Sequence, residues 1–173
     1  HILGSTSSGG PFWSEDFDGN GGTGSNWDAT LNFPIATQGS QANLFYDSNL
    51  GSTTDNDLHI STAPAIFGDL GYQYFESALG WTDTDKRSIS QSINTTGKTA
   101  IILSFNYIEN GNGTSDNAIV EYSINNGGSW TTLADMPKNA SGSSPWVFYS
   151  FSISLPASCE GITTLKIAFR WQN

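Results

Sequence analysis

The sequence is poor in the residues on which disulfides, nucleic-acid binding and membrane insertion depend. Its 173 residues include a single cysteine, so no disulfide forms within the chain, and Cys159 is interpreted as a small buried apolar residue rather than a reactive thiol. Six Lys and Arg stand against sixteen Asp and Glu, and the resulting charge of −10 repels phosphate backbones and anionic membranes. No apolar run is long enough to span a bilayer. The composition therefore predicts no nucleic-acid partner and no membrane insertion.

Residues suited to catalysis are also scarce. The two histidines are His1 and His59, and no G-x-S-x-G nucleophile elbow occurs, so a serine–histidine mechanism lacks its parts. Zinc chemistry lacks His and Cys ligands. Paired carboxylates could hydrolyse a glycoside, but the pairs in this sequence lie in Gly- and Asn-rich loops rather than in strands that line a cleft. We therefore predict that the chain is not an enzyme, with a glycoside hydrolase as the less favoured alternative.

Strand and turn formers make up most of what is present. Gly, Ser, Thr and Asn dominate, aromatic residues reach 13%, and strong helix formers are few, which favours strands joined by tight turns. Residues 1–11 have the composition of a flexible Gly/Ser leader. Residues 12–173 are long enough to form one domain with its own core.

Alternation of apolar and polar residues locates the strands. The most regular segment is 99–107, TAIILSFNY, in which one face is apolar. No helical pattern of ten residues occurs, so the fold class predicted is an antiparallel two-sheet β-sandwich of the jelly-roll type. The other predicted strands are 12–17, 43–46, 58–61, 88–93, 118–123, 130–133, 146–155 and 164–171.

A turn motif separates two of these strands. Residues 123–130, SINNGGSW, match the spacing S-x-D-x-G-x-x-W, with Asn125 where Asp is usual. This motif resembles the Asp-box of sialidase propellers and reelin-type jelly rolls. The resemblance implies a structural hairpin built on Ser123, Asn125 and Gly127, whose polar side chain holds its own turn while Trp130 packs beneath. Asn in place of Asp keeps the hydrogen-bond acceptor and loses the charge.

The wider layout carries a second resemblance. Four segments (EDFD at 15–18, ILSFNY at 102–107, DNAIVEYS at 116–123 and LKIAFRW at 165–171) together resemble MAM-like and reelin-like jelly rolls. Such domains occur in large bacterial surface proteins exported by type IX secretion. The resemblance implies a secreted or cell-surface location and a non-catalytic structural or adhesive role, with a cell-surface glycan or protein as partner.

The last predicted strand suggests that the chain continues elsewhere. Segment 164–171 has apolar residues on one face, as expected of a strand inside a sheet, yet only two residues follow it. Such a strand needs a neighbour on each side. We therefore predict that one partner lies beyond Asn173 or in another chain, so that the sandwich lacks its closing strand and belongs to a longer chain or assembly.

Acidic residues near the start of the domain predict a calcium site. Related jelly rolls hold Ca²⁺ there, which implies Glu15, Asp16 and Asp18 as ligands, with Asp116 nearby. Alternation places Asp16 and Asp18 on one side of the chain, and carboxylate oxygens are what Ca²⁺ prefers. The alternative is that these are solvated charges on an acidic surface.

Clustered aromatic residues give the alternative function. Tyr72, Tyr74, Phe75 and Trp81 lie between turns and could form a platform for sugar rings, as in a carbohydrate-binding module attached to a secreted enzyme. The competing interpretation is that they fill the core, as aromatic residues usually do in β-rich chains.

Overall fold

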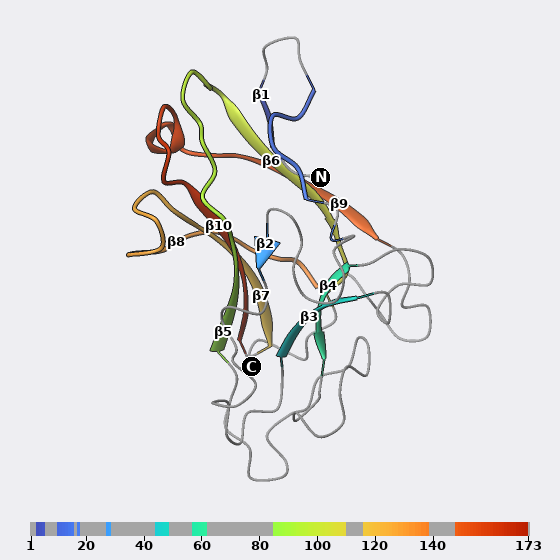
Figure 1. The fold of residues 1–173 in the computed structure, drawn as a ribbon. Coiled ribbons are helices and arrows are strands. Elements are labelled where there is room, and N and C mark those ends of the chain that lie inside the picture. The colour runs from blue at the N-terminus through green and yellow to red at the C-terminus, as the bar shows by residue number, and fades with distance from the viewer. Residues whose placement is uncertain are drawn as a thin grey trace.

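The computed structural model describes residues 3–5, 10–15, 17, 27–28, 44–48, 57–61, 85–109, 116–138 and 148–172. Nearly all of the regular structure in these residues is strand (Figure 1). A 3-10 turn, η2 (Ala157–Cys159), precedes the last strand. The strands are β1 (Leu3–Ser5), β2 (Trp27–Asp28), β3 (Leu44–Ser48), β4 (Asp57–Ser61), β5 (Asp85–Ser90), β6 (Ile101–Tyr107), β7 (Asn117–Ser123), β8 (Thr131–Asp135), β9 (Tyr149–Ser154) and β10 (Lys166–Gln172).

The strands form two main sheets, which Figure 1 shows as separate layers. The small sheet has the order β1-β6-β9, and the large sheet has the order β2-β5-β10-β7-β8. Strands β3 and β4 form a separate pair, and every pairing is antiparallel. The prediction of an all-β, antiparallel two-sheet sandwich is confirmed.

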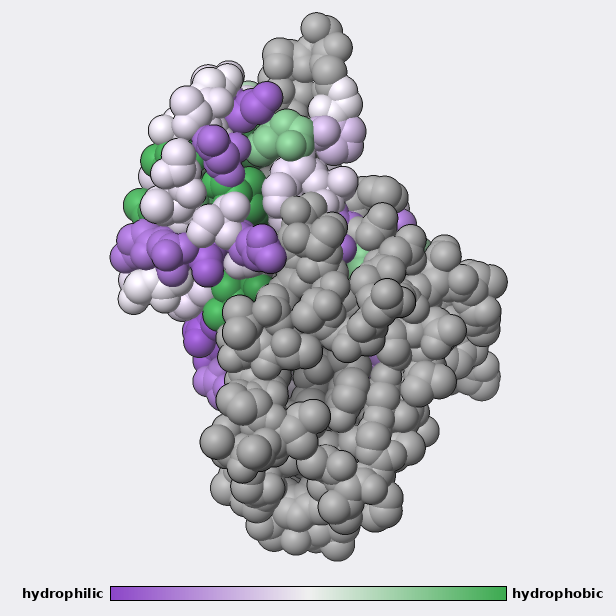
Figure 2. Space-filling view, viewed as in Figure 1, coloured by the Kyte–Doolittle hydropathy of each residue, from purple (hydrophilic) through white to green (hydrophobic). Residues whose placement is uncertain are grey.

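The core lies between the two sheets. Strand β6 of the small sheet contributes Ile101, Leu103 and Phe105, which alternate with more exposed residues and face Val120 of β7 and Ile167 of β10. This alternation is the sequence pattern that predicted β6, because only the inward positions need to be apolar. In the space-filling view, polar side chains surround the apolar ones over much of the described surface (Figure 2).

The aromatic residues of the core link the two layers. The ring of Phe105 on β6 lies 5.3 Å from that of Phe151 on β9 and 5.0 Å from that of Phe169 on β10, centroid to centroid. The contact with Phe169 is edge-to-face, a preferred geometry for aromatic pairs. These contacts join the small sheet to the centre of the large one.

The N-terminal part differs from the expectations drawn from the sequence. Residues 3–5 pair with β6, although 1–11 had the composition of a flexible leader. The predicted strand at 12–17 is wrong for the residues described, because Phe17 has a φ of 59° and only Trp13 makes a bridge. A side-chain oxygen of Glu15 accepts the N–H of Phe17 at 2.9 Å, a local hydrogen bond that competes with strand pairing.

Strand β10 has both of its neighbours within this chain. It pairs with β5 through Ala168–Gln172 and with β7 along its whole length. The prediction that one partner lies outside the chain is therefore wrong. The pattern of residues 164–171 correctly indicated a strand inside a sheet, but the pattern of one strand does not say which distant segment pairs with it.

Candidate functional site

The hairpin between β7 and β8 occupies the position that the sequence predicted. Ser123 at the end of β7 accepts hydrogen bonds through its Oγ from the main-chain N–H of Gly127 at 2.9 Å and of Asn125 at 3.3 Å. The same hydroxyl donates to Asn125 Oδ1 at 2.8 Å. One buried hydroxyl therefore satisfies two turn donors, which is why a small polar residue is needed there.

The side chain of Asn125 completes the turn. Its Oδ1 accepts the N–H of Ser129 at 2.9 Å, and its Nδ2 donates to Ser129 Oγ at 3.0 Å. Asn126 and Gly127 follow with φ values of 59° and 90°, the left-handed backbone that asparagine and glycine adopt at least cost. The turn is thus held by its own side chains.

Trp130 is half-buried rather than enclosed beneath the turn. A Cβ atom placed on Gly127 would lie 3.6 Å from the Trp130 ring, so the glycine and the ring are close neighbours. The guanidinium carbon of Arg87 lies 5.8 Å from the ring centroid, within the range of a cation–π contact. Trp130 therefore links the hairpin to a group of charged residues on the large sheet.

The turn is also bound to the segment that leads into β10. The N–H of Asn126 donates to the carbonyl of Thr164 at 3.1 Å, and the hydroxyl of Thr164 donates to the carbonyl of Ile124 at 2.6 Å. Ser92 Oγ donates to Asn126 Oδ1 at 2.7 Å. These bonds hold the hairpin against two segments that are distant in sequence.

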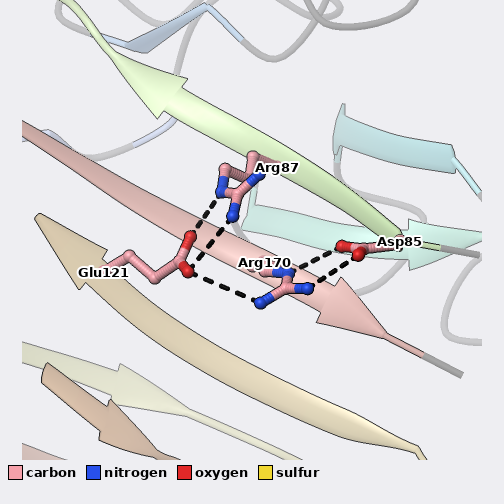
Figure 3. A network of polar contacts seen from close by, with 4 residues as sticks. All are labelled: Asp85, Arg87, Glu121 and Arg170. Atoms are coloured by element: carbon pink, nitrogen blue, oxygen red, sulfur yellow. Dashed lines mark hydrogen bonds and ion pairs between the residues drawn. The ribbon is translucent and has the colours of Figure 1, made fainter. Parts of the chain in front are cut away.

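Four charged residues meet on the face of the large sheet that points away from the core (Figure 3). The register places Arg87 of β5 opposite Arg170 of β10, and Glu121 of β7 opposite Ala168 of β10. Asp85 lies at the start of β5 and completes the set. We call Asp85, Arg87, Glu121 and Arg170 the charge cluster.

Both oxygens of Glu121 contact arginine. The Nε of Arg87 donates to Oε2, the Nη2 of Arg87 donates to Oε1 at 3.2 Å, and Arg170 Nη1 lies 3.6 Å from Oε1. The Glu121 side chain is 4% exposed, so it depends on these partners in place of water. Figure 3 shows its carboxylate directed toward both guanidinium groups.

Asp85 and Arg170 form the outer pair of the charge cluster. Arg170 Nε and Nη2 each donate to one oxygen of Asp85 at 2.6 Å, a bidentate arrangement. The hydrogen bond from Arg170 lowers the pKa of Asp85, against a smaller opposing effect of partial burial. The same bond raises the pKa of Arg170. Two positive and two negative charges therefore compensate one another and hold β5, β10 and β7 together.

Sequence reasoning missed the charge cluster. The available signal was a single charged residue on an outward position of an otherwise uncharged strand, namely Glu121 within NAIVEYS. A single charge in such a strand indicates a partner across the sheet, because buried carboxylates are almost always paired. Which residue is that partner depends on the order of the strands in the sheet.

The predicted calcium ligands are described only in part. Glu15 and Asp116 are buried, whereas Asp16 and Asp18 lie outside the described residues. Within the described residues, no group of three or more His, Cys, Asp or Glu side chains is arranged to hold a metal ion. The calcium site stays a prediction that rests on the resemblance and on the acidic composition.

The predicted sugar platform also lies outside the described residues, because these do not include Tyr72, Tyr74, Phe75 and Trp81. The structure instead exposes Phe148 and Tyr149 at the start of β9, which are 46% and 45% exposed. Cys159 is buried in the core, and desolvation raises its pKa to about 11, in keeping with a small apolar role.

In comparisons with known proteins, the chain matches no family model, no curated protein and no solved structure. Among the residues that the structure describes, no helix has the length and apolar character needed to cross a membrane.

Proposed function

We propose that the chain is a non-catalytic structural or adhesive module of a secreted or cell-surface protein. The observation that supports this most is that the potentially reactive side chains on the large sheet are engaged in structural contacts. Glu121 lies between two arginines, and Ser123 is occupied by the main chain of its own turn. A general acid or base must exchange protons with a substrate, whereas these groups hold strands and a turn in place.

The hairpin supports the structural interpretation. Its hydrogen bonds run from Ser123 and Asn125 to the turn that they enclose, with the glycine at the position that needs positive φ. The same proposal includes what the resemblance to MAM-like and reelin-like jelly rolls implies. These implied properties are export by type IX secretion, bound Ca²⁺ and a cell-surface glycan or protein as partner. The two-sheet sandwich agrees with it, although many sandwiches share that architecture.

A glycan array probed with the fluorescently labelled chain, in Ca²⁺ and then in chelator, tests the proposal. Glycans that bind are also assayed for release of reducing ends. We expect no product release under either condition. Release that is abolished by Glu15→Gln would contradict the proposal and favour the glycoside hydrolase.

Two tryptophan variants separate the structural module from the carbohydrate-binding alternative. Trp81→Ala alters the predicted sugar platform, and Trp130→Ala serves as a matched control because its ring lies at the hairpin. Binding of one glycan class that is lost in the first variant and retained in the second would assign the chain to the carbohydrate-binding modules instead.

A further inference from the structure

Strand β9 forms one edge of the small sheet. It pairs with β6 from Ser154 opposite Ile102 to Tyr149 opposite Tyr107, without a break in register. Its other side has no partner strand among the residues that the structure describes. Four of its six residues are exposed with the whole chain in place. Among the described strands, β9 is therefore an edge strand with an unbroken register and mostly exposed residues.

The main-chain groups of this edge point outward at alternate residues. The N–H of Leu155 donates to the carbonyl of Ile101 at 2.9 Å, so residue 155 bonds toward β6. In an antiparallel pair, successive residues direct their main-chain groups to opposite sides. Ser150, Ser152 and Ser154 therefore direct their N–H and C=O groups away from β6, which provides a set of donors and acceptors for a further strand.

One of the two edge strands of the large sheet, β8, has protective features that β9 lacks. β8 pairs with β7 across a register shift between Val120 and Glu121, ends in Asp135 and is followed closely by Pro137 and Lys138. Bulges, charges and prolines prevent strand addition at sheet edges. β9 has an unbroken register, and β1, β6 and β9 contain no charged residue.

We propose that β9 pairs with the β9 strand of a second copy of this chain, antiparallel and about a two-fold axis, so that two small sheets become one continuous sheet. Tyr149, Phe151 and Ile153 lie on the core face and alternate with serines on the other. Antiparallel pairing of this strand with itself places apolar residues beside apolar residues and serines beside serines.

Charge and exposure both suit this edge to a contact between two copies. Copies with a net charge of −10 repel one another, and pairing through the small sheet adds no contact between like charges, because its strands carry no charged residue. The exposed rings of Phe148 and Tyr149 stand at the start of β9 and are available for burial in such a contact. The proposal does not depend on whether the chain is adhesive.

Sedimentation velocity of the full chain over a range of concentrations tests the proposal. Ser152→Lys places a charge on the exposed edge, where two copies bring like charges together, and Thr132→Lys is the matched control on the edge strand β8. We expect the wild type and Thr132→Lys to shift from monomer to dimer, and Ser152→Lys to remain monomeric. A cooperative thermal unfolding transition in each variant shows that both are folded.

Three results would overturn the proposal. The first is a wild-type chain that stays monomeric at every concentration. This holds even if the chain binds a synthetic peptide of residues 149–154, because the edge would then accept a strand but not a second copy. The second is a dimer that Ser152→Lys leaves intact. The third is assembly beyond the dimer, because two-fold pairing of β9 closes after two copies.

Discussion

Glu121→Gln is the substitution that most directly tests the charge cluster. The amide keeps the shape of the side chain but replaces one acceptor oxygen with a donor that faces guanidinium N–H groups. Removing one partner of a buried ion pair costs about 3–5 kcal/mol. Here the cost is reduced, because Arg87 is 31% exposed and Arg170 keeps its two bonds to Asp85. We therefore expect a loss of about 2–3 kcal/mol, just below the range for a fully buried pair.

Chemical and thermal unfolding of matched variants measure this loss. For a domain of this size, about 2–3 kcal/mol corresponds to a fall in melting temperature of about 4–12 °C. Asp85→Asn is the control, because the side chain of Asp85 is 51% exposed and exposed pairs contribute at most about 1 kcal/mol. If Glu121→Gln destabilised the chain no more than Asp85→Asn, the charge cluster would not hold the three strands together and the reasoning would fail.

Three further predictions follow from the site. Ser123→Ala removes the acceptor for the N–H of Gly127 and should lower the free energy of unfolding by about 1–3 kcal/mol; an unchanged urea midpoint would show that the hydroxyl does not hold the turn. Cys159 should react with a thiol reagent at pH 8 on the order of 100-fold more slowly in the folded than in the unfolded chain, and equal rates would contradict its burial. Because Arg170 lowers the pKa of Asp85 in the folded state, the stabilisation by their pair is present above the unfolded-state pKa of about 3.9 and is lost as the pH falls through the lower folded-state value. The stability difference between wild type and Asp85→Asn should therefore shrink toward zero below about pH 4, and a difference that grows there would contradict this linkage.

The strands after residue 85 could be predicted because their two faces differ. Ile101, Leu103 and Phe105 face the core while their neighbours face outward, so the alternation is visible in the sequence itself. β1 and β2 could not be predicted in this way, because two or three residues are too few to show a period. Their positions are set by pairing with β6 and β5, respectively.

At the site, the sequence predicted contacts between neighbouring residues but not contacts between distant strands. The turn residues Ser123 and Asn125 act on their own neighbours, so a local motif was enough to predict the hairpin. The contacts of Glu121 depend on β10 lying between β5 and β7, an order that does not follow the sequence. No local pattern specifies that order, and the charge cluster was missed for this reason.

The central position of β10 has a consequence for how the chain folds. β10 is the last of the described strands to be synthesised, yet it separates β5 from β7 in the finished sheet. The β7–β8 hairpin involves only neighbouring residues and can form early, whereas the large sheet cannot join until residues 166–172 have emerged. Until then, β5 and β7 each present an open edge, so a nascent chain that stalls before residue 166 is the form most exposed to aggregation.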